Sequence, residues 1–190
     1  MQTFGIYIIG DEILSGKRQD GHLSKAIEIL SVRGLSLSWA QYLGDDPAQI
    51  TSAFKNSFAK SDIEKENIVF SFGGIGATPD DHTRQCAADA LNVPIERHAG
   101  AVAEIVAQFG EGAYPKRVFM ADFPQGADLI PNPVNRVAGF STGLKNQKHS
   151  HYFLPGFPAM AHPMMEWVLD THYAHLFRSE ERRVGKECCR

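Results

Sequence analysis

Short apolar runs that end at glycine alternate with helical segments along the first half of the chain. The run Phe4 to Ile9 is rich in β-branched residues and stops at Gly10-Asp11, which is typical of a buried parallel strand. Apolar residues at helical spacing follow over 20–33, and Gly34 ends that helix. The pattern repeats with a strand over 35–43, a helix over 47–59 and a strand over 68–72. This rhythm predicts an α/β fold with a doubly wound, parallel sheet.

The second half of the chain continues with helices over 81–91 and 99–109, a strand over 151–154 and a helix over 158–177. We expect Asp80 or Thr83 to cap the first of these helices. The segment 114–140 is rich in proline and holds only short apolar pieces, which predicts small strands and loops that face a site. The packing face of the last helix is predicted to be Met160, Met164, Trp167, Val168 and Leu176.

Composition limits the class of protein. A chain of 190 residues with 43% hydrophobic and 22% charged residues is long enough for one domain with its own core, here 1–177. A net charge of −3 without a basic patch argues against nucleic-acid binding. No apolar stretch approaches the roughly 20 residues of a membrane helix, so we expect no membrane partner and a cytoplasmic location.

The segment 178–190 abandons the amphipathic pattern and is almost wholly charged. It resembles a translated cloning artefact, and a solvated native tail is the alternative. Cys86, Cys188 and Cys189 form neither a disulfide framework nor a zinc-binding spacing, so we expect all three to be reduced.

Carboxylates follow three of the expected strand or glycine segments. They are Asp11 and Glu12, then Asp45 and Asp46, then Asp80 and Asp81. Because the carboxyl ends of parallel strands meet at one edge of a sheet, ligands bind there where the strand order reverses. We therefore expect the three loops to line one cleft. For any single carboxylate, helix capping is the alternative role.

The glycine run that precedes the last of these loops suggests phosphate binding. Gly73, Gly74 and Gly76 allow a tight turn whose N–H groups can approach phosphate oxygens near a helix N-terminus. The run is neither a dinucleotide fingerprint nor a P-loop, and a tight strand-to-helix turn explains it equally well.

Carboxylates beside a phosphate need a cation between them, so we predict Mg²⁺ or another divalent metal as cofactor, held by Asp45 and Asp81. Thr78, Asp80, Asp11 and Glu12 are expected to shape the pocket. His82 could reach the ligand, whereas surface positions are expected for the histidines that lack a metal-binding spacing, His149, His151, His172 and His175.

Four motifs together resemble the molybdopterin-binding (MoaB/Mog-like) superfamily, and within it the N-terminal domain of the competence/damage-inducible (CinA) family. They are Gly10-Asp11-Glu12-Ile13-Leu14-Ser15-Gly16, Leu43-Gly44-Asp45-Asp46, the run from Gly73 to Thr83, and Leu154-Pro155-Gly156-Phe157-Pro158. The resemblance spans residues 4 to 177. It implies a three-layer α/β domain that forms homo-oligomers and binds a nucleotide diphosphate or a molybdopterin-type molecule. Asp45 and Asp81 match two functional aspartates of the adenylyltransferases.

The resemblance also implies candidate activities. The CinA branch is associated with divalent-metal-dependent hydrolysis of ADP-ribose-type pyrophosphates, which is the leading hypothesis. Molybdopterin adenylyl transfer and a non-catalytic pterin- or nucleotide-binding module are the alternatives. Two departures affect specificity: Ala77-Thr78-Pro79 after the glycine run, and the segment 132–139, a loop expected to face the ligand. Deamidation is not expected, because it belongs to a separate domain of the longer family members.

Overall fold

The computed structural model describes residues 2–59, 66–143 and 149–177. The charged segment 178–190, with Cys188 and Cys189, lies outside these ranges. The strands are β1 (Gln2–Ile9), β2 (Leu37–Leu43), β3 (Glu66–Phe72), β4 (Ile95–Arg97), β5 (Asp122–Pro124), β6 (Asp128–Ile130), β7 (Gly139–Thr142) and β8 (His149–Leu154). The α-helices are α1 (Asp11–Leu14), α2 (His22–Ser31), α3 (Pro47–Ala59), α4 (Thr83–Leu91), α5 (Ala99–Phe109) and α6 (Pro158–His172). Three short 3₁₀ helices are Gly110–Ala113, Arg117–Ala121 and Ala174–Leu176.

The main sheet has six strands in the order β2-β1-β3-β8-β7-β6. The first four are parallel, while β7 and β6 run antiparallel at one edge. The chain leaves β1 toward β2 and then crosses back to β3 on the other side of β1. The strand order therefore reverses between β1 and β3, where a parallel sheet opens a crevice at its carboxyl edge. The predicted doubly wound, mostly parallel α/β fold is confirmed.

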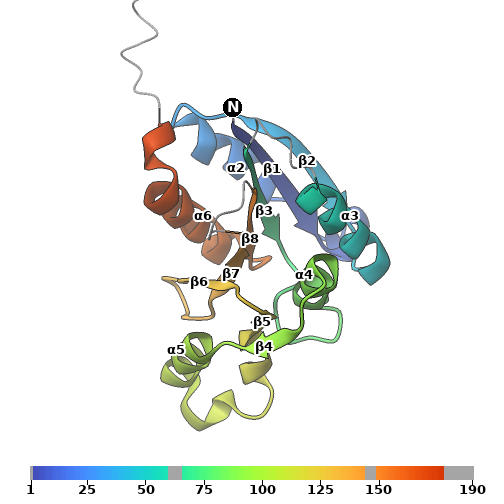
Figure 1. Ribbon diagram of the computed structural model, residues 1–190, viewed down its shortest axis with the longest axis vertical. Coiled ribbons are helices and arrows are strands. Elements are labelled where there is room, and N and C mark those ends of the chain that lie inside the picture. The colour runs from blue at the N-terminus through green and yellow to red at the C-terminus, as the bar shows by residue number, and fades with distance from the viewer. Residues whose placement is uncertain (1, 60–65, 144–148, 178–190) are drawn as a thin grey trace, which may run out of the picture.

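Alternating side chains of the strands separate two cores, so the domain has three layers. Phe4, Ile6 and Ile8 of β1 face the helices α2 and α6, and Tyr7 and Ile9 face α3 and α4. Figure 1 shows these helix pairs on opposite sides of the sheet.

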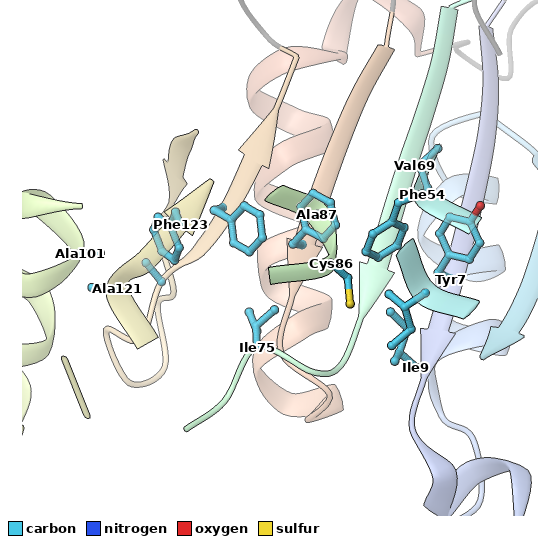
Figure 2. Packing of buried hydrophobic residues seen from close by; sticks show 14 of the residues in the cluster. Tyr7, Ile9, Phe54, Val69, Ile75, Cys86, Ala87, Ala101, Ala121 and Phe123 are labelled. Atoms are coloured by element: carbon cyan, nitrogen blue, oxygen red, sulfur yellow. The ribbon is translucent and has the colours of Figure 1, made fainter. Parts of the chain in front are cut away.

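The core on the α3 and α4 side continues into a small outer unit. Strands β4 and β5 form a two-stranded antiparallel sheet beside α5, at the lower end of Figure 1. Figure 2 shows the buried cluster running from Tyr7 and Ile9 past Ile75 to Ala121 and Phe123. The outer unit thereby covers the segment that follows β3. Strand β4 was not predicted, because three residues carry no measurable periodicity.

Two sequence predictions about helices are wrong. Neither Asp80 nor Thr83 caps α4: His82 occupies the cap position without a side-chain cap bond, and the Thr83 hydroxyl donates to Gly73 O. The last helix ends at His172 rather than 177, and Trp167 is 37% exposed. Its buried face is Ala161, Met164, Met165, Val168 and Leu169.

Among the described residues, none of the helices is both long and apolar enough to cross a membrane.

Candidate functional site

A cavity of about 470 Å³ lies at the carboxyl edge of the sheet, where the strand order reverses. The cavity is lined by the ends of β1 and β3, by the residues that follow these strands, and by the turn before α6. Phe109, Met120, Asn135 and Val137 from the second half of the chain complete the wall. Of the predicted site residues, the lining includes Glu12, Gly73, Gly74, Gly76, Asp45, Thr78, Asp80 and Asp81.

Two hydrogen bonds join the acidic loop after β1 to the acidic loop after β2. The Asp11 N–H donates to Asp45 Oδ2 (2.9 Å), and the Asp45 N–H donates to Asp11 Oδ1 (3.1 Å). A Cβ at Gly44 would lie 2.5 Å from that Asp11 oxygen, so only glycine permits this approach. Asp11 thus positions Asp45 and is not itself among the lining residues.

Burial and neighbouring negative charges destabilise the ionised form of the Asp45 carboxylate. Its pKa is raised, first by burial and then by the negative charges of Asp11, Glu12 and Asp80, although the Asp11 N–H opposes this shift. A carboxylate among like charges is stabilised when a cation lies beside it. The neighbouring Asp46 has a different role, because it caps α3 by accepting from the Ala48 N–H (2.9 Å).

The Asp81 carboxylate closes its own loop. Its Oδ1 accepts from the Gly76 N–H (2.8 Å), and its Oδ2 accepts from the Thr78 N–H (2.7 Å) and the Thr78 hydroxyl (2.5 Å). Three of the roughly four acceptor positions of a carboxylate are therefore taken. We expected Asp81 to share a metal with Asp45. That role stays a prediction. In the structure Asp81 closes its own loop, and Asp80 is the member of this loop whose charge raises the pKa of Asp45.

The glycine run is shaped by close backbone contacts. Gly73 has φ 108°, and a Cβ there would lie 2.3 Å from the carbonyl oxygen of Ile9. Its N–H donates to Leu154 O (3.0 Å), and its carbonyl accepts from the buried Thr83 hydroxyl (3.0 Å). The N–H groups of Gly73 and Gly76 are thus used inside the protein. Their predicted role as phosphate donors needs correction.

Other backbone donors of the same loop remain. Within the described ranges, the N–H groups of Gly74, Ile75 and Ala77 have no hydrogen-bond partner, and all three residues line the cavity. From α4, the half-buried Arg84 donates to the Ile75 carbonyl and so restrains the loop. A rigid loop with partnerless N–H groups is suited to binding an anion.

A family model described as a "Probable molybdopterin binding domain" matches residues 5–175. The chain belongs to this molybdopterin-binding family. The CinA-like protein of Anaeromyxobacter dehalogenans is 32% identical over 168 residues, covering 86% of this chain and 40% of that protein. A "Putative competence-damage inducible protein" of Lacticaseibacillus casei is 30% identical over 167 residues, 86% of this chain and 39% of that one. The chain thus spans about 40% of the length of these curated relatives.

Solved structures agree with this assignment of the molybdopterin-binding domain. A crystal structure of "the protein CinA with unknown function" from Thermoplasma acidophilum has a TM-score of 0.77 at 25% identity, covering 90% of this chain and 98% of that one. The molybdopterin biosynthesis enzyme MoaB of Thermus thermophilus has a TM-score of 0.58 at 18% identity, covering 93% and 94%, and shares the fold. The predicted resemblance to the MoaB/Mog-like superfamily and its CinA branch is confirmed.

Arg18, His22 and Phe157 are among the cavity residues of this molybdopterin-binding domain that the sequence did not assign to the site. Arg18 is the one lysine or arginine in the lining. His22 is buried, stacks on Phe72 and lies with Nε2 3.2 Å from Gly156 O. Because a carbonyl oxygen only accepts, this nitrogen carries the proton in the neutral ring. Burial also lowers the pKa of His22.

His22 borders the cavity, whereas His82, which we expected could reach a ligand, is not among the lining residues. One histidine prediction is wrong. His151 is fully buried rather than at the surface. No spacing motif marks His22, since its position depends on the contact between α2 and the turn before α6.

The loop that departs from the family pattern borders the cavity, as expected. Asn135 and Val137 are lining residues, and Asn135 Oδ1 accepts from the Val137 N–H (3.1 Å). Metal ligands are sparse: in the described ranges, no group of three or more His, Cys, Asp or Glu is arranged to hold an ion. A cation here would need phosphate and water oxygens to complete its coordination.

Proposed function

We propose that this domain hydrolyses the pyrophosphate bond of ADP-ribose-type nucleotides with the help of a divalent cation. The observation that carries the proposal is the position of the Asp45 carboxylate, which lines the cavity together with the carboxylates of Glu12, Asp80 and Asp81. Burial and neighbouring carboxylates destabilise its negative charge, and a cation at this point would remove that penalty.

The charges of the residues that line the cavity give a second argument for a bound cation. The lining contains one arginine and four carboxylates, those of Glu12, Asp45, Asp80 and Asp81. A diphosphate would add further negative charge and be repelled unless a cation lay between. Carboxylate, phosphate and water oxygens are the ligands that Mg²⁺ prefers, and such an ion neutralises charge on the phosphate oxygens. Asp45 would hold it, with Glu12 and Asp80 adding negative charge nearby.

The reaction adds one water across the P–O–P bond. The water oxygen bonds to one phosphorus, the bridging oxygen leaves with the other phosphate, and the two water protons pass to the products or to solvent. ADP-ribose would give AMP and ribose 5-phosphate. The N–H groups of Gly74, Ile75 and Ala77 would donate to phosphate oxygens, and Asp45 would act through the cation.

A second candidate is a module that binds a phosphorylated nucleotide or pterin without turnover. The scarcity of protein metal ligands in the described ranges favours it. Adenylyl transfer to molybdopterin would use the same phosphate-binding loop. Oligomer formation stays a prediction from family resemblance, which light scattering coupled to size-exclusion chromatography would test.

A substrate panel separates these functions. Cleavage of ADP-ribose and FAD would be measured with Mg²⁺, Mn²⁺ or Co²⁺, beside adenylylation of molybdopterin. We expect ADP-ribose cleavage, and Asp45→Asn should lower kcat by about a hundredfold or more. Raising the metal concentration should recover part of this loss.

Asp46→Asn is the matched control, since it removes the same charge one residue away and asparagine caps a helix about as well as aspartate. No turnover of any diphosphate with any of the three metals would refute hydrolysis. Binding without turnover would support the module.

A further inference from the structure

An exposed aromatic ring and a guanidinium lie together at the edge of the cavity. The Arg18 guanidinium carbon is 5.4 Å from the centroid of the Phe157 ring, and both residues line the cavity. Phe157 stands just before α6 with extended backbone, and its side chain is 56% exposed. Exposing a phenylalanine to this extent costs hydrophobic free energy, which a planar ligand lying on the ring would recover.

Contacts with Glu12 fix the position of Arg18 beside the cavity. Its N–H donates to Glu12 O (2.9 Å), and its guanidinium is 3.6 Å from Glu12 Oε1. Both side chains of this ion pair are about half exposed, so the attraction between them is weak. The guanidinium can therefore turn toward an entering ligand without losing its position at the cavity edge.

Similar arginine and phenylalanine pairs elsewhere show what distinguishes this one. Arg97 lies 5.2 Å from the ring centroid of Phe119, which is 50% exposed, yet neither residue lines the cavity. Arg117 lies over Phe109, and only the phenylalanine reaches the lining. Among the described residues, Arg18 with Phe157 is the pair in which both members border the cavity.

We propose that Phe157 and Arg18 form the subsite for a planar heteroaromatic ring, such as a purine or a pterin, in the same cavity as the phosphate-binding loop. The assignment rests on the proposed binding of a phosphorylated ligand, but not on its hydrolysis. Rings with a π face stack on phenylalanine, and the guanidinium plane stacks on the same kind of ring. The glycine loop then holds the phosphates while this pair holds the ring.

The test measures binding rather than turnover. Isothermal titration calorimetry with Mg²⁺ would compare α,β-methylene-ADP with methylenediphosphonate, which carries the same non-hydrolysable phosphonate unit without a ring. Phe157→Ala should weaken the nucleotide probe about 5- to 150-fold, as stacking losses do, and leave the diphosphonate within about twofold. Phe157→Tyr should retain binding. Arg18→Lys keeps the charge but loses the planar stacking group, so it should weaken the nucleotide more than the diphosphonate.

Phe119→Ala is the matched control, and it should leave both affinities unchanged because that pair lies outside the lining. Neopterin phosphate in place of the nucleotide distinguishes a pterin from a purine as the preferred ring. The subsite would be wrong if Phe157→Ala lost equal affinity for the ringed and ringless probes, or lost no affinity for either. It would also be wrong if the wild-type protein bound no ringed probe.

If Phe157→Ala weakens only the ringed probe and no diphosphate is hydrolysed, the ring subsite stands and the proposed hydrolysis is wrong. If the protein hydrolyses ADP-ribose and Phe157→Ala binds the nucleotide as well as the wild type does, hydrolysis stands and the ring subsite is wrong.

Discussion

Replacing Asp81 by asparagine removes one acceptor oxygen from a loop that uses both. In the wild-type loop, the Gly76 N–H bonds one carboxylate oxygen, and the N–H and hydroxyl of Thr78 bond the other. The asparagine oxygen can replace only one of them, and its NH₂ group then faces a backbone N–H. In either orientation of the amide, at least one backbone donor loses its acceptor.

The size of the effect follows from these contacts. A hydrogen bond to a charged acceptor contributes about 1.5–3 kcal/mol, and the partly exposed position reduces this because water can replace the lost acceptor. We therefore expect Asp81→Asn to lower the free energy of unfolding by about 1–2 kcal/mol. For a chain of this length each kcal/mol corresponds to about 2–4 °C, so Tm should fall by about 2–8 °C.

Differential scanning calorimetry at neutral pH would measure the change, with Asp46→Asn as control. That control removes the same charge from a helix cap, where asparagine serves equally well, so its Tm should stay within about 1 °C of the wild type. If Asp81→Asn also left Tm unchanged, the loop-closing role of Asp81 would be wrong. Its carboxylate would then be available to a ligand, as the sequence first suggested.

Three further predictions concern neighbouring residues. Because the pKa of Asp45 is raised in the folded state, its charge destabilises the fold at neutral pH, so Asp45→Asn should unfold at the same or a higher temperature at pH 7. This difference should vanish below the unfolded carboxyl pKa of about 3.9, as thermal unfolding across a pH series would record. Thr83→Val should cost about 1–3 kcal/mol in urea unfolding, since it leaves the Gly73 carbonyl without its buried hydroxyl donor. Gly73→Ala should cost at least about 3 kcal/mol, because the new Cβ would meet Ile9 O at a positive φ; a variant with native circular dichroism and Tm would contradict this.

Local patterns were sufficient for the four parallel strands β1, β2, β3 and β8 and for the helices α2, α3, α4 and α5. The helix predicted over 47–59 is α3 (Pro47–Ala59), and the strand predicted over 68–72 lies within β3 (Glu66–Phe72). These elements are long enough for the period of their apolar residues to indicate which face is buried. The small sheet of β4 and β5 was beyond this reasoning, because three-residue strands depend on their partners rather than on a pattern.

By itself, the sequence determined that the acidic loops lie at one edge of a parallel sheet, because strand direction follows from the alternation of strands and helices. Only the tertiary structure decided what each carboxylate does there. Asp45 faces the cavity, Asp46 caps α3, and Asp81 closes its own loop, although all three are aspartates beside a strand or glycine run. These roles depend on hydrogen-bond directions at distances near 3 Å, which the order of residues does not encode locally. The pairing of Arg18 with Phe157 likewise arises because α6 begins beside the loop that follows β1, a contact made by packing between distant segments.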